Sequence, residues 1–408
     1  MAHNKVCRLI MVRTGQGRAG LARGPIPNFI GALALKHAGQ GKQRPKAARG
    51  LEKQQMVKVP ISRKSPKSFP PAISGSVRVE ELESQVLKGN PLGDPTRRQV
   101  AYYTPPSGKT EGKPLLVLLP GFTGAGWMQF RPFGYLGEAA YQRIDRLIRD
   151  RVCDEAVLVS PDCLTTLGGS QYVNSTATGR YQDYVVREIV PWAKEKFHTG
   201  ETGILGQSSG GFGALHLAME HPDVFQAVGS SSGDMAFEYG YMVDIPGAVR
   251  EFRRTGGPEE FLAGMFEDPI TFKGPGDPSV SAISMLAMAA CYSPRESEPG
   301  EFDLPFDASS GEIIPITWER WLAFDPVRRL ATKKGMEALR RMKLVHITAS
   351  TPDEWSLDIG ARIFAATALR QKVPVVHEEF EGGHFSSGPR FESLFTRMVA
   401  ALSSERKR

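Results

Sequence analysis

Short runs of apolar residues alternate along the chain with longer segments in which apolar and polar residues mix at helical spacing. Short apolar runs bounded by Gly, Pro or Asp are typical of buried parallel strands, and longer amphipathic segments are typical of helices. The pattern predicts strands at 99–104, 115–119, 156–159, 202–205, 225–229, 344–348 and 375–380. It predicts helices at 137–151, 181–197, 209–219, 357–371 and 389–402.

This alternation of strands and helices favours an α/β fold, with a mostly parallel central sheet that helices cover on both faces. Chemistry in such sheets collects beyond the carboxyl ends of the strands. Residues that directly follow a predicted strand are therefore the first candidates for a functional site.

The pentapeptide 206–210, Gly-Gln-Ser-Ser-Gly, lies between a predicted strand and a predicted helix. It has the form G-x-S-x-G, in which a tight turn raises the serine hydroxyl above the sheet and the glycines avoid collisions with neighbouring backbone. A chain with 43 glycines can contain such a pattern by chance, so the interpretation depends on the flanking strand and helix. Ser208 is the predicted nucleophile, and it needs a base and an acid to act at neutral pH.

The base is predicted by elimination among eight histidines. Only His384 directly follows a predicted strand, on the glycine-rich loop Glu-Gly-Gly-His, and it comes last, as the chain order serine, acid, histidine requires. Asp353, beyond the strand 344–348, is the predicted acid that orients the imidazole. Asp234 is its rival because some hydrolases place the acid one strand earlier, and Glu354 has the alternative role of a charge at a helix N-terminus.

Two backbone N–H groups are predicted to hold the negatively charged oxygen that forms during acyl transfer. One belongs to Ser209, at the start of the helix after the pentapeptide, and the other to Phe122, in the loop after the strand 115–119. Trp127 and Met128, which follow this loop, are candidates for contacts with a substrate, as is Asp234.

The net charge of +7 arises in the first part of the chain. Residues 1–67 hold 15 Lys and Arg and one acid (+14), whereas residues 68–408 hold 36 Lys and Arg and 43 Asp and Glu (−7). Gly, Pro, Lys and Arg interrupt the apolar runs of residues 1–67, which predicts disorder. Three interpretations of this basic segment, residues 1–67, compete: a nucleic-acid-binding arm, a targeting peptide, and upstream sequence before a true start at Met56. We favour the third interpretation. We expect no nucleic-acid partner for the folded body.

The four cysteines are widely spaced, and none forms a C-x-x-C pair. This usage is typical of reduced thiols in a cytoplasmic protein. No apolar run approaches the length of about 18 residues that a membrane-spanning helix needs.

Together, several segments resemble the putative-esterase family of α/β-hydrolases, which includes esterase D (S-formylglutathione hydrolase), enterochelin-esterase-like enzymes and mycolyltransferases. The resemblance spans about residues 75–402 and rests on the segments 118–124, 206–214, 232–234, 353–362 and 378–384. It implies that Ser208, Asp353 and His384 form a catalytic triad. Pro120 stands where many relatives have a histidine, but the oxyanion donor there is a backbone group and is unaffected.

The resemblance also implies an α/β-hydrolase domain over residues 68–408. The long segment at about 235–330 departs from a compact α/β-hydrolase, and we expect this insertion to form a helical cap over the site. We expect hydrolysis of a small-molecule carboxylic ester through an acyl-enzyme, with no cofactor and no metal. The alternatives are acyl transfer of the mycolyltransferase type, hydrolysis of a thioester such as S-formylglutathione, and a hydrolase fold that only binds a partner. The oligomeric state is left open, with a homodimer as one alternative.

Overall fold

The computed structural model describes residues 72–132, 137–268, 273–274 and 276–403. The predictions about the basic segment 1–67 lie outside these residues. No helix within the described ranges is both long enough and apolar enough to cross a membrane.

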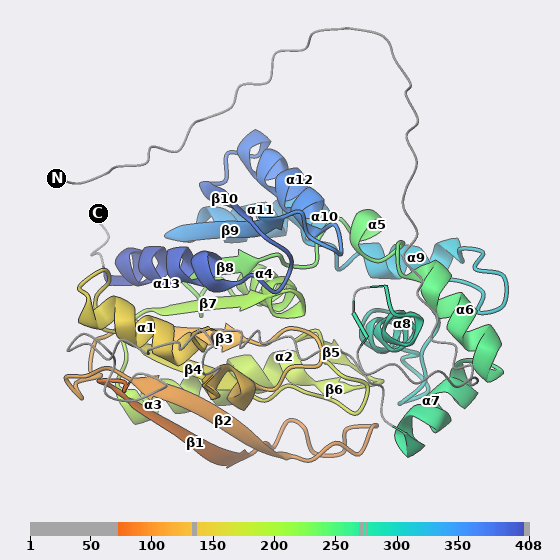
Figure 1. Cartoon of the computed structure of the whole chain (residues 1–408), viewed down its shortest axis with the longest axis horizontal. Helices are drawn as coiled ribbons and strands as arrows, with labels where there is room; N and C mark the ends of the chain where they lie inside the picture. The colour runs from red at the N-terminus through yellow and green to blue at the C-terminus, as the bar shows by residue number, and fades with distance from the viewer. Residues whose placement is uncertain (1–71, 133–136, 269–272, 275, 404–408) are drawn as a thin grey trace, which may run out of the picture. The chain divides into compact units, whose positions relative to one another are not determined.

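A sheet of eight strands forms the centre of the fold, in the order β1-β2-β4-β3-β7-β8-β9-β10 (Figure 1). The strands are β1 (Ser76–Glu83), β2 (Arg97–Thr104), β3 (Leu115–Leu119), β4 (Val157–Pro161), β7 (Thr202–Gln207), β8 (Ala227–Ser231), β9 (Leu344–Thr351) and β10 (Val375–Glu381). β2 runs antiparallel to β1 and β4, and all other neighbours are parallel. The predicted α/β class and mostly parallel sheet are confirmed.

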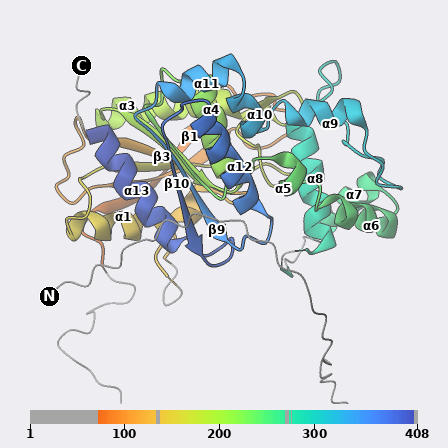
Figure 2. The ribbon, with the colours of Figure 1, turned by 90° about the horizontal axis from the view of Figure 1, so that it is seen from above.

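Helices cover both faces of the sheet (Figures 1 and 2). α1 (Ala140–Arg149) and α13 (Gly388–Ser403) pack on one face. On the other lie α2 (Tyr181–Asp183), a π-helical turn at Tyr184–Ile189, α3 (Val190–Phe197), α4 (Ser209–Glu220), α11 (Lys333–Arg340) and α12 (Leu357–Arg370). Because both faces are covered, a central strand such as β3 is apolar and buried at every position.

The parallel register brings the carboxyl ends of five strands to one edge of the sheet. Leu119 of β3 pairs with Gly206 of β7, and Gln207 pairs with Ser231 of β8. Ser231 in turn pairs with Thr348 of β9, and β9 ends beside β10. The loops that follow these strands therefore meet at this edge.

The segment between β8 and β9 forms a further group of helices beside the sheet (Figure 2). They are α5 (Phe237–Gly240), α6 (Ile245–Thr255), α7 (Pro258–Glu267), α8 (Pro278–Tyr292) and α9 (Pro315–Leu322), and the next helix, α10 (Pro326–Leu330), packs with α11 and α12 instead. We call residues 236–325 the insertion. Its buried aromatic residues pack with one another and with Phe212 of α4, so most of its apolar residues form its own core.

One buried carboxylate joins the two ends of the insertion. Asp325, 1% exposed, accepts hydrogen bonds from the backbone N–H groups of Ala236 and Phe237, each at 3.0 Å. It also caps α10 by accepting from the N–H of Val327 at 2.8 Å. The chain therefore enters and leaves the insertion at adjacent points.

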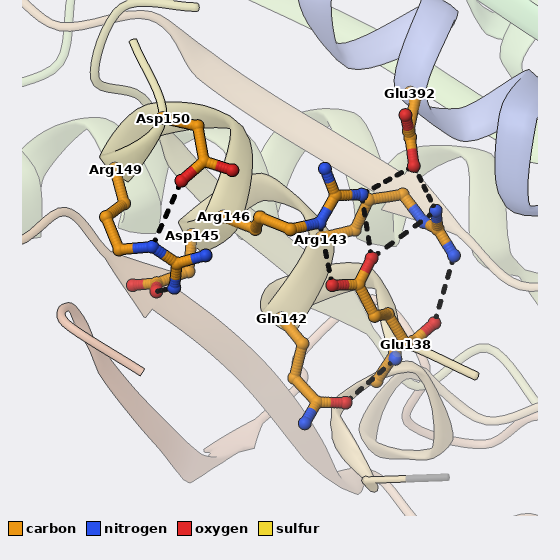
Figure 3. A network of polar contacts seen from close by, with 9 residues as sticks. Glu138, Gln142, Arg143, Asp145, Arg146, Arg149, Asp150 and Glu392 are labelled. Atoms are coloured by element: carbon orange, nitrogen blue, oxygen red, sulfur yellow. Dashed lines mark hydrogen bonds and ion pairs between the residues drawn. The ribbon is translucent and has the colours of Figure 1, made fainter. Parts of the chain in front are cut away.

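A network of ion pairs joins α1 to α13 (Figure 3). Arg143 and Arg146 of α1 both contact Glu392 of α13, at 2.7 and 2.5 Å. Both arginines also contact Glu138, which precedes α1. The hydrogen bond from Arg146 is the main reason why the pKa of Glu138 is lowered. This network fixes α13, the helix that begins just after His384.

Candidate active site

Ser208 lies on the turn between β7 and α4, at the edge where the strands end. Its backbone has φ 56° and ψ −128°, a region that residues with side chains rarely occupy. Its N–H donates to the carbonyl oxygen of Ser231 at 3.0 Å, and its carbonyl accepts from the N–H of Phe212 in α4 at 3.0 Å. The surrounding backbone therefore holds this strained turn in place.

Both glycines of the pentapeptide lie where no side chain fits. A Cβ atom on Gly210 would lie 2.0 Å from the carbonyl oxygen of Leu119, and one on Gly206 would lie 2.4 Å from the backbone of Gly210. These contacts are with backbone atoms, which cannot turn away as a side chain can. The glycines thus let α4 begin close to the end of β3, as the pentapeptide predicts.

The structure brings His384 and Asp353 together. His384 follows β10, Asp353 follows β9, and Nδ1 of the imidazole lies 2.9 Å from Oδ2 of the carboxylate. Burial raises the pKa of Asp353, but the hydrogen bond and charge of His384, together with hydrogen bonds from Trp355 and Ser232, lower the pKa overall. An ionised carboxylate at this position orients the ring and stabilises its protonated form.

His384 also lies against the turn at residues 206–210 that carries Ser208, which we call the elbow. The side-chain amide of Gln207 donates to the backbone carbonyl of His384 at 2.8 Å. Within the described residues the Ser208 hydroxyl makes no hydrogen bond, including to the imidazole. In enzymes without bound substrate, catalytic hydrogen bonds are often long or poorly aligned, and they tighten only when substrate binds.

Two charged residues hold the loop that carries His384 (the histidine loop): Glu354, for which the sequence offered a role at a helix N-terminus, and Arg390, which sequence reasoning missed. Glu354 accepts from the N–H of His384 at 2.6 Å, so it contacts this loop, and α12 begins only at Leu357. Arg390, fully buried on α13, donates to the carbonyl of His384 and to the hydroxyl of Ser232, each at 2.5 Å. Burial lowers the pKa of Arg390 to about 10. The only sequence signal for Arg390 is a charge within an otherwise apolar helix face.

The loop that carries Phe122 lies beside the serine. A Cβ atom on Gly121 would lie 3.3 Å from the Cβ of Ser208. Among the described residues, the N–H groups of Phe122 and Ser209 have no hydrogen-bond acceptor. Both groups are therefore available to a ligand atom near Ser208, which is what an oxyanion hole requires.

A segment that sequence reasoning missed, residues 168–172, holds this loop from the other side. The carbonyl of Gly168 accepts from the N–H of Thr123 at 2.7 Å, and the ring of Phe122 fills the space beside Gly168 and Gly169. The hydroxyl of Tyr172 donates to the carbonyl oxygen of Pro120. Gln171 and Tyr172 have positive φ values of 48° and 56°, which is strain of the kind that concentrates at functional sites.

The three substrate-contact candidates occupy different places. Asp234 is buried beside the elbow and accepts a hydrogen bond from the hydroxyl of Ser209 at 3.1 Å. Trp127 packs on the α1 and α13 side of the sheet, and Met128 is 41% exposed. In the part of the chain that the structure describes, neither Trp127 nor Met128 has a hydrogen bond or ring contact with Ser208 or His384.

Three other described histidines, His216, His346 and His377, pack into the fold away from this edge. His346 and His377 lie within β9 and β10, and His216 on α4 contacts Gln182 and Arg329. Burial lowers the pKa of all three histidines. No group of three or more His, Cys, Asp or Glu within the described ranges is arranged to hold a metal ion.

Residues 95–237 match the model of the Putative esterase family. The match contains Phe122, Ser208 and Asp234 and ends before Asp353 and His384. No curated protein sequence matches the chain.

Similar solved structures include a ferulic acid esterase, 17% identical over 81% of this chain and 98% of that chain, with a TM-score of 0.51. An S-formylglutathione hydrolase from Agrobacterium tumefaciens is 16% identical over 82% and 99% of the two chains, with a TM-score of 0.49. A fluorophosphonate-binding serine hydrolase of Staphylococcus aureus is 14% identical over 81% and 99%, with a TM-score of 0.47. The first of these similarities shows a shared fold.

Proposed function

We propose that the chain is a member of the Putative esterase family, whose model matches residues 95–237, and that it is a serine hydrolase that cleaves a carboxylic ester through a covalent acyl-enzyme. The observation that carries the proposal is the 2.9 Å contact of His384 with Asp353 at the edge where Ser208 occupies a strained turn. These three residues come from loops after three different strands. Their convergence at one edge provides a nucleophile, a base and an orienting acid.

In this mechanism His384 removes the proton of Ser208 as the hydroxyl oxygen attacks the ester carbonyl. Asp353 stabilises the imidazolium, and the N–H groups of Phe122 and Ser209 stabilise the oxyanion. The imidazolium then protonates the leaving alcohol. A water molecule, deprotonated by His384, attacks the acyl-enzyme and releases the acid.

A fluorophosphonate probe tests the nucleophile. We expect the full-length protein to be labelled and to hydrolyse short-chain esters, and Ser208→Ala to lose labelling and about 10⁴-fold or more of its turnover. Ser310→Ala, a matched change at an exposed serine, should leave both properties unchanged. Labelling of Ser208→Ala at the wild-type rate would overturn the proposed mechanism.

The proposal also covers the cellular compartment of the protein and the molecule that accepts the acyl group. Cys153, Cys163 and Cys291 are free thiols, which supports a reducing compartment such as the cytoplasm. Water is the proposed acceptor of the acyl group. Adding alcohols or a glutathione thioester to the activity assay would reveal acyl transfer or thioester hydrolysis directly.

A further inference from the structure

Asp234 is a buried carboxylate with no cationic partner. It is 6% exposed, and no Lys or Arg of the described residues pairs with it. Three neutral donors contact it: the side-chain amide of Gln171 at 3.2 Å, the hydroxyl of Tyr241 at 2.9 Å and the hydroxyl of Ser209 at 3.1 Å. A charge buried in this way costs free energy, so its presence beside the elbow calls for an explanation.

All three donors contact the same oxygen atom, Oδ2. The other oxygen, Oδ1, accepts no hydrogen bond from the described residues, yet it is not among the fully buried polar atoms that lack a partner. It therefore keeps some contact with solvent. An ionised carboxylate can accept several hydrogen bonds, and this one has capacity left on the atom that a ligand could reach.

The cluster lies where the elbow meets the insertion. Ser209 is adjacent to the nucleophile, and Tyr241 and Tyr292, which also contacts Gln171 at 3.0 Å, belong to the insertion. Burial raises the pKa of Asp234 overall, although its hydrogen bonds and the charge of His384 act in the opposite direction. The carboxylate is thus within electrostatic range of the catalytic imidazole.

A second polar atom in this cluster also lacks a partner. Gln171 is 1% exposed, and its Oε1 atom is buried without a hydrogen bond among the described residues. Its backbone is in the left-handed region, with φ 48°. Buried polar atoms without partners are rare in folded proteins and often mark sites where a ligand or water binds.

We propose that Asp234 selects the acyl group: it favours acyl chains that carry a hydroxyl or another hydrogen-bond donor and disfavours acyl chains that carry a carboxylate. This inference rests on the proposed esterase function. A donor on the acyl chain gains an acceptor at Oδ1, whereas a second carboxylate beside Asp234 meets like-charge repulsion in a poorly solvated place.

The test compares three esters with acyl chains of equal length: methyl butanoate, methyl 3-hydroxybutanoate and monomethyl succinate. For the full-length wild type we expect the highest kcat/KM with the hydroxylated ester and a value for monomethyl succinate roughly tenfold or more below that for methyl butanoate. Asp234→Asn, which keeps the shape and removes the charge, should raise the succinate-to-butanoate ratio about tenfold. The readout is this ratio within each variant, so a change in turnover that affects all three esters equally does not alter it.

Asp244→Asn is the matched control, because Asp244 is a carboxylate of the insertion that bonds to Ser281 and not to the elbow. Asp244→Asn should leave the succinate-to-butanoate ratio of kcat/KM unchanged. An equal loss with all three esters in Asp234→Asn would overturn the inference, since Asp234 would then only support the elbow. Equal kcat/KM values of the wild type for methyl butanoate and monomethyl succinate would also overturn the inference, even before any variant is made. Failure of the proposed function would differ, because no ester would turn over and the fluorophosphonate probe would not label Ser208.

Discussion

Two tyrosines on the same face of the sheet, both almost fully buried, differ in what their hydroxyl groups contact. Tyr172 donates to the carbonyl of Pro120, directly before the loop that carries Phe122. Tyr184 is equally buried, but its hydroxyl has no partner within the described residues. Tyr172 is thus a positioning residue for the loop that carries Phe122, which we call the oxyanion loop, whereas the hydroxyl of Tyr184 has no such role.

This difference gives a prediction. Tyr172→Phe keeps the ring and removes the hydrogen bond, so we expect kcat to fall about tenfold with little change in KM, because the oxyanion donor matters most in the transition state. Tyr184→Phe, the matched control, should keep kcat and should change the free energy of unfolding by less than about 0.5 kcal/mol. Steady-state kinetics and chemical denaturation of both variants check this. Equal kcat values for the two variants would show that the Tyr172 hydroxyl does not position the loop.

Residues of the candidate site differ in how far the sequence could predict them. Ser208, His384 and Asp353 follow strands directly, so the strand pattern and the chain order were enough to select them. Glu354 and Arg390 act through contacts with the backbone of the histidine loop, and such contacts depend on the tertiary structure. Trp127 and Met128 were chosen by closeness in sequence to the oxyanion loop, which does not fix where their side chains point.

At the scale of elements, the start of α4 is the part of the fold most sensitive to added volume. A Cβ atom on Gly210 would lie only 2.0 Å from the carbonyl oxygen of Leu119, whereas a Cβ atom on Gly264, also in a helix, would have open space around it. The same substitution at these two positions therefore separates the steric effect from the effect on helix propensity.

We expect Gly210→Ala to lower the free energy of unfolding by about 1–3 kcal/mol and to slow fluorophosphonate labelling, because the new methyl group pushes α4 away from β3. Gly264→Ala should stabilise the protein by up to about 1 kcal/mol and leave labelling unchanged, since alanine favours helix over glycine. Denaturation curves and labelling rates measure both effects. A Gly210→Ala variant with normal labelling would show that the elbow tolerates the shift.

Strands and helices of the central layers were predictable because each buries a continuous apolar run or stripe. β1 was not predicted, since it lies at the edge of the sheet and its residues are exposed or only half-buried. The helices of the insertion were not placed either. Their apolar residues pack against each other across loops, and a pattern along one segment does not reveal its partner in another.

At the scale of the whole molecule, the buried histidines set a pH dependence of stability. Burial lowers the pKa of His216, His346 and His377 in the folded chain. In the unfolded chain a histidine titrates near pH 6.5. The unfolded state therefore binds more protons as pH falls through that value, and the stability that these neutral histidines contribute above pH 6.5 is lost below it.

We accordingly expect the free energy of unfolding to fall between pH 7 and pH 5, with a contribution of up to about 2 kcal/mol from His216. His216→Gln removes one titrating group and should flatten this slope. His198→Gln, at an exposed histidine, should keep the wild-type slope. Urea denaturation at several pH values measures the slopes. A wild-type slope in His216→Gln would exclude this histidine as a source of the acid sensitivity.

The contacts of Asp325 with Ala236 and Phe237 span 89 and 88 positions in sequence. Bringing distant positions together costs chain entropy, which grows only with the logarithm of the number of residues between them. Once Asp325 closes the insertion, the effective chain between β8 and β9 becomes short. The two strands can then pair as if a brief connection joined them. Because the two ends of the insertion are adjacent, we expect that it can be shortened or replaced between Ala236 and Asp325 while the loops that carry Ser208 and His384 keep their places.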